Sequence, residues 1–340
     1  MPGWRDRLRG DPVPWLLEPA DPAVRAAALQ RLEGRPPDAA DVVEARAAAM
    51  AVDPIRAILA AQDPAGWWQR PGPGYGPKYT GTVWQVVFLD QLGADPDDER
   101  IQRACEYVLT WCPTSSGGLG AAGGSRERHP PPSAVIHCLN GNLVRALVGF
   151  GRLDDPRLQA AVDWAARTIL GEDVDRWYAS GTCGPGFACA ANEGRPCAWG
   201  AVKELLGLAR IPPERRTPRV TAAVTAGVEF LLSTDPARAD YPMGWGNTVP
   251  SRSWFRPGFP SGYVTDVLQV LEVLAELGHA HDPRLVPALE WLLSLQDGDG
   301  RWRNQYAYNG KTTVDVERQG RPSKWVTLRA CAVLRAAGPG

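Results

Sequence analysis

The sequence predicts an all-α protein in which about five helix hairpins close into a single α/α toroid. Helix-start signals recur at regular intervals: Pro96 is followed after 60 residues by Pro156, after 62 more by Pro218 and after 65 more by Pro283. Between these signals, strongly apolar helical stretches alternate with more charged ones, and no run shows the strict alternation of a half-buried strand. Repeated hairpins of this kind bury a shared core by stacking side by side.

Each predicted helix start is a capping residue followed by proline. An Asp or Thr side chain accepts hydrogen bonds from free N–H groups of the first turn, and proline at the first helical position lacks an N–H that would be unpaired anyway. The sequence around two of these starts repeats: residues 151–158 and 278–285 both end in Asp-Pro-Arg-Leu. The six starts are Asp21-Pro22, Asp53-Pro54, Asp95-Pro96, Asp155-Pro156, Thr217-Pro218 and Asp282-Pro283.

The first helix of each hairpin is the more apolar one, which places it on the inside of the ring. Second helices such as 101–110 and 158–168 carry more charge and belong outside, so every inner helix begins at the same end. Residues 1–56 depart from the repeat and are interpreted as peripheral N-terminal helices. The chain 1–340 is then one domain, with hairpin repeats over 57–336. The predicted inner helices are 79–92, 137–150, 197–209, 263–277 and 324–336.

The composition excludes several functional classes. Its 37 Lys and Arg residues against 38 Asp and Glu residues give a formal net charge of -1, so no nucleic acid partner is expected. No run of about 18 apolar residues appears, which predicts no transmembrane segment and leaves peripheral membrane contact open. The polar first 15 residues do not resemble a secretory signal, and the sequence predicts a cytoplasmic protein. Seven cysteines, an odd number, then favour reduced thiols over disulfides.

Two stretches carry a more specific signature. Residues 62–68 and 296–302 both fit Gln-x3-Gly-x-Trp and end in Trp68 and Trp302. With the hairpin pattern, the chain from about 57 to 335 resembles the prenyltransferase and squalene-hopene cyclase (terpenoid cyclase) α/α-toroid repeat superfamily. The resemblance implies that both tryptophans are structural. It also implies an enzyme of the terpene cyclase or prenyltransferase type, which acts on an isoprenoid or other apolar substrate in the toroid lumen.

Two places are candidates for a catalytic acid. Class II cyclases of this superfamily protonate an alkene with an Asp-x-Asp-Asp motif, and Asp95, Asp97 and Asp98 fit it. In the repeat, however, this motif occupies the turn where other hairpins have helix caps, so both interpretations stay open. Asp266 is the preferred acid, because a carboxyl group desolvated in an aromatic lumen has the raised pKa that a general acid needs. The alternative is that Asp266 belongs to a polar stripe along its helix.

Three cysteines are expected to meet at the N-terminal ends of two neighbouring inner helices. Cys138 and Cys197 begin these helices, and Cys189 lies on the Gly- and Pro-rich loop between them. Thiolates suit zinc, and three ligands leave a position for water, substrate or a fourth ligand. The sequence thus predicts a zinc site of Cys138, Cys189 and Cys197, with buried free thiols as the alternative. Candidates for a fourth ligand are His137, Asp266 and Cys183.

The predicted substrate-binding residues lie at or near the starts of the inner helices, where side chains converge on one rim. Their aromatic members offer ring faces that stabilise a carbocation by about 0.5–2 kcal/mol each. The long aromatic loop 245–263 is predicted to cover this opening as a lid. The set is Tyr79, Trp84, Asn142, Trp199, Tyr263, Lys324 and Trp325.

Three functions stay open at this point. The first is the terpene cyclase or prenyltransferase-like enzyme implied by the resemblance. The second is a Cys-ligated zinc enzyme of the same fold with an unidentified substrate. The protein prenyltransferases of the superfamily bind zinc at the same end of the toroid, but their Asp-x-Cys ligand pair is not found in this sequence. The third is a non-catalytic toroid that binds a peptide or a lipid.

Overall fold

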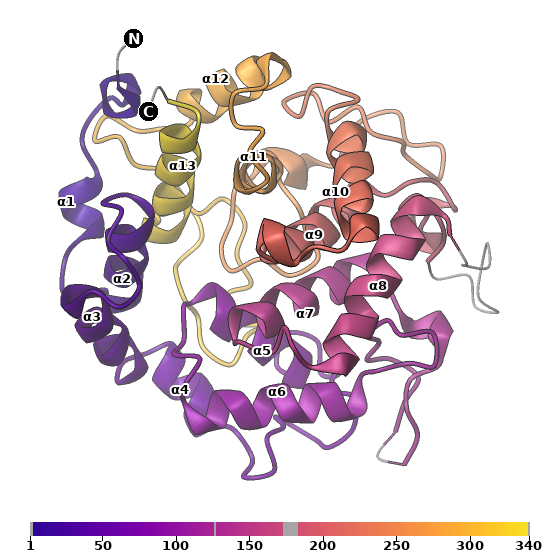
Figure 1. The fold of residues 1–340 in the computed structure, drawn as a ribbon. Coiled ribbons are helices and arrows are strands. Elements are labelled where there is room, and N and C mark those ends of the chain that lie inside the picture. The colour runs from indigo at the N-terminus through magenta and orange to yellow at the C-terminus, as the bar shows by residue number, and fades with distance from the viewer. Residues whose placement is uncertain (1–2, 126, 173–182, 339–340) are drawn as a thin grey trace.

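Helices form the regular structure of the chain, as predicted. The computed structural model describes residues 3–125, 127–172 and 183–338, and in these ranges only isolated β-bridges accompany the helices. Figure 1 shows the helices as a ring, with an inner set around the centre and an outer set around it. The fold is an α/α toroid. None of the helices in the described ranges has the length and apolarity needed to cross a bilayer.

The five predicted inner helices follow one another around the ring, each packed on the next. Two of them begin later than predicted. Tyr79 has a φ of 71°, which is incompatible with a helix, and Asp266 is extended and caps its helix. The inner helices are α5 (Thr82–Gln91), α7 (His137–Gly149), α9 (Ala198–Ala209), α11 (Val267–Glu276) and α13 (Lys324–Ala336). The outer helices are α6 (Glu99–Trp111), α8 (Pro156–Leu170), α10 (Pro218–Leu231) and α12 (Val286–Ser294).

The N-terminal helices belong to the ring and not to its periphery. They are α1 (Val13–Leu16), α2 (Pro22–Arg31), α3 (Ala40–Met50) and α4 (Ile55–Ala60). Helix α2 packs on α13 and on α3, and Figure 1 shows α2 and α3 between α13 and α4. Helix α2 therefore takes the position of a further inner helix and closes the toroid. The sequence analysis placed it outside because its alanines lack the large apolar side chains that mark the other inner helices.

Two of the four outer helices, α8 and α10, start at the predicted capping residue, whereas Asp95 does not cap α6 and Asp282 does not cap α12. Asp155 accepts a hydrogen bond from the Arg157 N–H at the start of α8 (2.9 Å), and Thr217 caps α10. At the Asp-x-Asp-Asp motif the cap is Asp98, which accepts from the Arg100 N–H (2.8 Å). The Arg100 guanidinium also binds Asp98 and lowers the pKa of its carboxyl group. A lowered pKa is the opposite of what an alkene-protonating acid needs.

Short 3-10 helices connect several elements. Asp282 was predicted to start α12, but it caps the 3-10 helix that precedes α12: its carboxylate accepts a hydrogen bond from the Arg284 N–H (2.9 Å). Helix α12 itself begins at Val286. The 3-10 helices are η1 (Trp4–Arg7), η2 (Pro132–Ala134), η3 (Ala190–Asn192), η4 (Pro213–Arg215), η5 (Arg252–Phe255) and η6 (Pro283–Leu285).

The two Gln-x3-Gly-x-Trp stretches form the same contacts in two places. The indole N–H of Trp68 donates to the Ile58 carbonyl oxygen (2.7 Å), and that of Trp302 donates to the Leu292 carbonyl oxygen (2.8 Å). Each tryptophan backbone N–H donates to a threonine hydroxyl group of the following inner helix. Both side chains are almost fully buried. Each motif therefore ties the end of one helix to the start of another, the structural role that the resemblance implies.

Replacing Trp68 by phenylalanine is expected to lower the free energy of unfolding by about 1–3 kcal/mol, because the Ile58 carbonyl oxygen loses the indole N–H and keeps only the Ala61 N–H as a donor (3.2 Å). The measurement is urea unfolding followed by circular dichroism. Trp245 is the matched control: its indole N–H also donates to a carbonyl oxygen (Ala191, 3.2 Å), but the side chain is 67% exposed and water replaces the lost bond. Equal destabilisation by Trp68→Phe and Trp245→Phe would contradict the tethering role.

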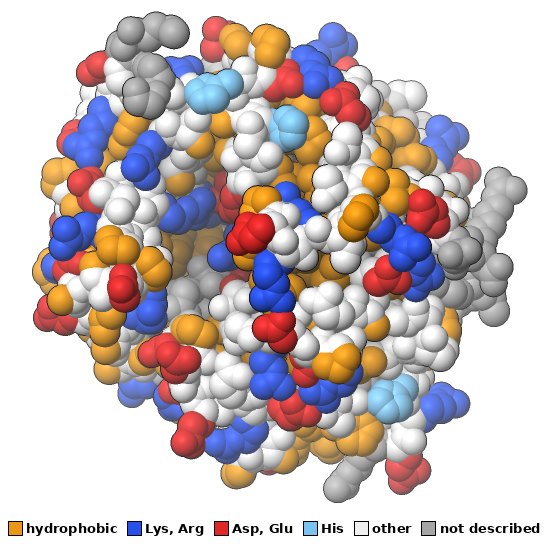
Figure 2. Space-filling view, in the orientation of Figure 1, with side chains coloured by type: hydrophobic (Ala, Val, Ile, Leu, Met, Phe, Trp, Pro, Cys, Tyr) orange, Lys and Arg blue, Asp and Glu red, His pale blue; other side chains and the backbone are white. Residues whose placement is uncertain are grey.

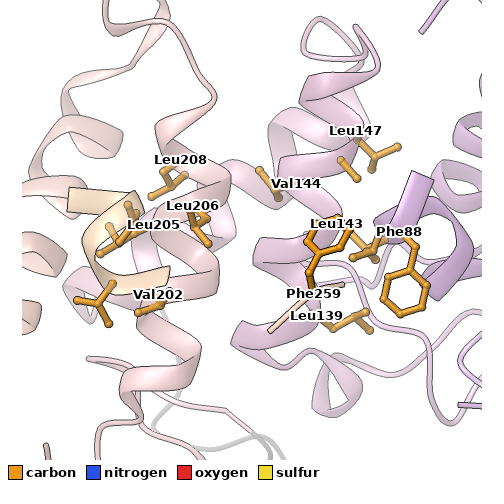
Figure 3. Close-up of a cluster of buried hydrophobic side chains, with 14 of the residues drawn as sticks. Phe88, Leu139, Leu143, Val144, Leu147, Val202, Leu205, Leu206, Leu208 and Phe259 are labelled. Atoms are coloured by element: carbon orange, nitrogen blue, oxygen red, sulfur yellow. The ribbon is translucent and has the colours of Figure 1, made fainter. Parts of the chain in front are cut away.

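The hydrophobic core lies between the helices of the ring. Figure 3 shows part of it, with leucine and valine side chains of α7 and α9 beside Phe88 of α5 and Phe259. Helices α7 and α9 approach very closely, because a Cβ atom added at Gly141 would lie 2.3 Å from the Lys203 backbone. One added at Gly207 would lie 2.8 Å from the Gly141 carbonyl oxygen. Glycine at both positions therefore brings the backbones of α7 and α9 into contact.

Candidate functional site

A cavity of about 430 Å³ lies inside the ring, toward the C-terminal ends of the inner helices. We call it the lumen cavity. Helices α2, α5, α7, α11 and α13 and the C-cap of α9 contribute to its wall. Figure 2 shows this face hollowed between α2 with α13 on one side and α11 on the other, with Lys and Arg side chains around the recess. Its volume lies in the range of about 300–1,000 Å³ that is typical of small-molecule sites.

One side of the lumen cavity is apolar. The rings of Phe259 and Trp325 stack with their centroids 4.6 Å apart and their planes 11° apart. Asn304 fixes the first of them, since its side-chain N–H donates to the Phe259 carbonyl oxygen (2.8 Å). Helix α2 adds a wall of three small side chains, because Ala23, Ala26 and Ala27 all face the cavity. The result is a rigid aromatic surface beside a wall without bulky groups.

The other side of the lumen cavity is charged. Five arginines line it against two carboxylates, Asp90 and Glu272, and Glu276 lies in the adjoining groove. Even with Glu276 counted, positive charges outnumber negative ones by two. The helix C-termini at this end of the ring contribute negative local charge, so the positive character comes from the arginine side chains alone. The arginines are Arg31, Arg46, Arg145, Arg210 and Arg329.

One of these arginines is fully engaged with a carboxylate. The Nε atom of Arg329 donates to Glu272 Oε2 (2.8 Å), a second guanidinium N–H binds the same oxygen, and Nη1 donates to the Gly258 carbonyl oxygen (3.0 Å). Burial alone would raise the pKa of Glu272, but Arg329, Arg31 and Arg145 outweigh it and bring the pKa to about 2. Glu272 is therefore an ionised partner for arginine and not a proton donor.

Arg145 is the least satisfied of the five. Its Nε atom is buried and has no hydrogen-bond partner among the described residues. The nearest carboxylate oxygens lie 3.9 Å away, from Asp90 to Nε and from Glu276 to Nη2. Arg210 is held as loosely, with its Nη2 atom 3.9 Å from the other oxygen of Asp90. The guanidinium groups of Arg145 and Arg210 thus both lie near the Asp90 carboxylate without a hydrogen bond to it, so their N–H groups are available to a ligand.

Three of the predicted substrate-binding residues come together, but away from the lumen cavity. Trp84 packs against Tyr79 (centroids 5.0 Å apart) and against Tyr263 (4.9 Å) at the N-terminal end of α5. Tyr308, which the sequence analysis missed, stacks on Tyr79 at 4.3 Å. None of the four lines the lumen cavity. They form an aromatic cluster with Trp84 at its buried centre.

The remaining predicted residues are scattered. Trp325 lines the lumen cavity, whereas Asn142 donates to the Gly262 carbonyl oxygen (3.2 Å) in the core. Lys324 lies on the other side of α13, where its Nζ atom is held by Glu18 (2.7 Å) and Asp21 (2.5 Å). Trp199 lines a separate groove of about 500 Å³, which we call the aromatic groove. The aromatic groove is lined mainly by Cys197, Trp199, Tyr241, Met243 and Trp254.

The predicted lid lies partly at the surface, whereas the predicted acid is buried. In the loop 245–263, Trp245 and Val249 are exposed, Trp254 borders the aromatic groove and Phe259 is buried at the lumen cavity, so only part of this loop reaches into the ring. Asp266 caps α11 by accepting from the N–H and the side-chain amide of Gln269 (3.0 and 2.9 Å). Burial raises the pKa of Asp266, the direction that the sequence analysis expected. Its carboxylate does not line the lumen cavity.

The cysteines gather as predicted, together with a fourth one. Cys183 accepts a hydrogen bond from the His137 N–H (3.3 Å) and pairs across a β-bridge with Cys189. A hydrogen bond from the Cys197 thiol lowers the pKa of Cys189 to about 6, aided by the N–H groups of Ala191 and Asn192. Burial raises the pKa of Cys138, whose sulfur is close enough to those of Cys183 and Cys189 for the charges to interact.

This thiol cluster gives the predicted zinc site no structural support. No three His, Cys, Asp or Glu side chains of the described residues are arranged to hold a metal ion. Both ring nitrogens of His137 are engaged as well, with Glu204 Oε1 and with the Gly184 carbonyl oxygen, each at 3.2 Å. Zinc binding by Cys138, Cys189 and Cys197 stays a prediction from the sequence, which elemental analysis of the purified protein would check.

The sequence analysis missed the arginines of the lumen cavity. A signal for them exists, because Arg145, Arg210 and Arg329 are each charged residues on, or directly after, a largely apolar inner helix. Asp90 and Glu272 interrupt α5 and α11 in the same way. Asp90 and Arg145 are the single charged residues that α5 and α7 carry apart from His137, whereas α9, α11 and α13 carry further charged residues. Their convergence follows only from the closure of the ring.

Comparison with known proteins finds similarity in structure only. No family model and no curated protein matches the sequence. A type II terpene cyclase from Scytonema covers 93% of this chain and 87% of its own, with 16% identity and a TM-score of 0.43. An unsaturated glucuronyl hydrolase specific for heparin covers 94% and 85%, with 9% identity and a TM-score of 0.47. These similarities are distant, although they extend over most of the chain. The ligand is therefore inferred from the residues of the lumen cavity and not from these proteins.

Proposed function

We propose that this chain is a terpene cyclase- or prenyltransferase-like protein whose lumen cavity binds an isoprenoid that carries an anionic group. The observation that carries the proposal is the Arg145 guanidinium, which is largely buried beside the cavity without a hydrogen-bond partner for its Nε atom. An unpaired buried donor is costly to folding and is satisfied when an anion supplies oxygen atoms. Arg31 and Arg210 flank it and offer further donors.

The apolar side of the cavity supports the isoprenoid part of the proposal. The stacked rings of Phe259 and Trp325 and the alanines of α2 offer a rigid apolar surface, beside the arginines and within the same volume of about 430 Å³. A ligand with one anionic end and one apolar end fits both sides. The positive charge that would recognise the anion comes from arginine side chains, of which Arg145 and Arg210 lie toward the C-terminal ends of α7 and α9.

The proposal is tested by calorimetric titration of the full-length protein with three probes. Geranyl diphosphate carries both chemical parts, inorganic diphosphate only the anion, and geraniol only the apolar chain. The expected result is tight binding of geranyl diphosphate and much weaker binding of the other two. Equal binding of geraniol would show that the arginines do not recognise the ligand, and equal binding of inorganic diphosphate would exclude the isoprenoid part.

Replacing Arg145 by glutamine is expected to weaken geranyl diphosphate binding about 10- to 100-fold, since a hydrogen bond to a charged group contributes roughly 1.5–3 kcal/mol. Thermal stability should not fall, because the wild-type guanidinium is desolvated and lacks a partner at hydrogen-bond distance. Arg219→Gln on the outer helix α10 is the control and should leave binding unchanged. Unchanged binding in Arg145→Gln would contradict the proposed site, and lost stability would mark Arg145 as structural.

The geometry favours binding in the lumen cavity over proton transfer from Asp266, whose carboxylate is used to cap α11. The catalytic role of Asp266 stays a prediction. Turnover of the bound isoprenoid would identify an enzyme, and binding without turnover would favour the non-catalytic lipid-binding toroid.

A further inference from the structure

The segment between Cys183 and Cys197 folds back on itself twice and brings two thiols to one face. A β-bridge joins Ala188 to Pro196, and hydrogen bonds flank it on both sides: the Cys197 N–H donates to the Phe187 carbonyl oxygen (2.9 Å), and the Cys189 N–H to that of Arg195 (3.2 Å). Side chains alternate between the two faces of such a pair. Cys189 and Cys197 lie one residue beyond the bridge in opposite strands, so their side chains share a face as diagonal neighbours.

Both thiols of this pair are partly exposed, as is Cys138 at the start of α7, whereas Cys183 is buried and its sulfur accepts the His137 N–H. Cys197 lies in the wall of the aromatic groove, beside Trp199 and Trp254. A small molecule in this groove therefore reaches Cys197 directly, and Cys189 is its neighbour on the same face of the hairpin.

The hairpin is held firmly against the far wall of the aromatic groove. The Asn192 side-chain amide donates to the carbonyl oxygens of Pro196 (2.8 Å) and Pro242 (3.0 Å), and its oxygen accepts from the Gly244 N–H (2.9 Å). Three bonds from one side chain thus fix the distance between the cysteine hairpin and the loop opposite. The bond to Pro196 lies within the hairpin and supports the fold that places Cys189 and Cys197 on one face.

We propose that Cys189 and Cys197 form a dithiol site that exchanges with small disulfides. The Cys189 thiolate attacks one sulfur of the small disulfide, which breaks its S–S bond, forms a mixed disulfide on Cys189 and releases one thiolate that takes up a proton. The Cys197 thiol then loses its proton, and its sulfur attacks the Cys189 sulfur and releases the second small thiol. In sum, two protein thiols are oxidised to one disulfide and one small disulfide is reduced to two thiols.

The assignment of roles follows from the surroundings of each sulfur. Cys189 is assigned as the attacking thiolate because the Cys197 thiol, its neighbour on the same face of the hairpin, lowers the pKa of Cys189 to about 6. Cys197 is the resolving residue, because it is the neighbour on the same face and lines the groove from which the small thiol leaves. Cys183 is excluded from this role by its burial and by its bond to His137.

The test is to incubate the full-length protein with glutathione disulfide, block the remaining thiols with iodoacetamide and map the peptides by mass spectrometry. The expected product is a Cys189–Cys197 cross-link. In Cys197→Ser the reaction should stop at a glutathione adduct on Cys189, and in Cys189→Ser the rate should fall at least about tenfold. Cys331→Ser, in the buried core, is the control and should react like the wild type.

Three results would overturn the proposal. One is a cross-link between Cys183 and Cys189, which would assign the wrong partner. A second is no reaction in a protein whose circular dichroism spectrum is native. The third is reaction only after a chelator removes a bound metal ion, which would make the cysteines ligands. None of these outcomes depends on isoprenoid binding in the lumen cavity. The thiol-exchange proposal can therefore fail while the isoprenoid proposal holds, and the reverse.

Discussion

Replacing Glu272 by glutamine is expected to lower the free energy of unfolding by about 3–5 kcal/mol, because it leaves the buried Arg329 guanidinium without its counterion. The Glu272 side chain is 1% exposed and that of Arg329 is 8% exposed, so water does not replace the lost charge. The glutamine has nearly the same shape, which isolates the charge as the cause. The measurement is urea unfolding at pH 7, followed by circular dichroism.

The pH dependence of this effect follows from the pKa of Glu272, which is about 2 in the folded protein against an ordinary value of 4.5. A lowered pKa contributes stability that is fully present above pH 4.5 and is lost as the pH falls toward 2. The wild type and Glu272→Gln should therefore converge in stability in strong acid.

Two further variants make the Glu272 prediction specific. Glu276→Gln lies one turn later on α11, where the side chain is 29% exposed and Arg145 is 3.9 Å away, so its effect should stay within about 1 kcal/mol. The double variant Glu272→Gln with Arg329→Met should recover most of the lost stability, since it removes both charges. If Glu272→Gln were no more harmful than Glu276→Gln, the buried ion pair would not stabilise the fold.

Replacing Lys203 by methionine is expected to stabilise the protein most at and below neutral pH, and the advantage should disappear above about pH 10. Lys203 is 1% exposed, and burial lowers the pKa of its ammonium group to about 7. Between pH 7 and 10.5 the unfolded chain binds a proton that the folded chain does not, so wild-type stability rises with pH. This difference in pKa between the unfolded and the folded chain corresponds to at most about 5 kcal/mol.

The surroundings of Lys203 support this direction. Burial disfavours its charged form, as do Arg329 and Arg145, and together they outweigh Cys138 and Asp266, which favour it. Its Nζ atom donates to the Gln269 amide oxygen, and loss of this bond in the methionine variant is an offset that does not vary with pH. Lys78→Met is the control, because Lys78 is exposed above the Tyr79 ring. Parallel stability curves for wild type and Lys203→Met between pH 7 and 10 would refute the prediction.

Much of the fold could be predicted because its signals are local. Cap-and-proline pairs such as Asp155-Pro156 fix a helix start within a few residues, and apolar periodicity separates inner from outer helices. Helix α2 was not recognised as an inner helix, because its alanine side chains are small and give only a weak apolar pattern, although they face the lumen cavity. The Asp95-x-Asp-Asp turn shows the limit of such signals, since only the structure decides that Asp98 is the cap.

The candidate site was harder to predict because it depends on closure of the ring. The sequence analysis placed the substrate-binding residues at the starts of the inner helices, because aromatic and polar residues such as Trp84 and Tyr263 are frequent there. In the structure these two side chains pack against each other. The functional signal was instead a charged residue within an apolar stretch of an inner helix, as in Arg145 and Arg329. The proximity of three cysteines was predictable from their spacing, but the engagement of both His137 nitrogens was not.

The contact between α7 and α9 at Gly141 and Gly207 has a mechanical consequence. With backbone against backbone there is no layer of side chains to rearrange, so the two helices must move as one rigid body. This body carries Cys138 and Cys197 at its N-terminal end and Arg145 and Arg210 at the other. Whatever displaces Cys138 and Cys197 at one end of this body therefore also displaces Arg145 and Arg210 at the other.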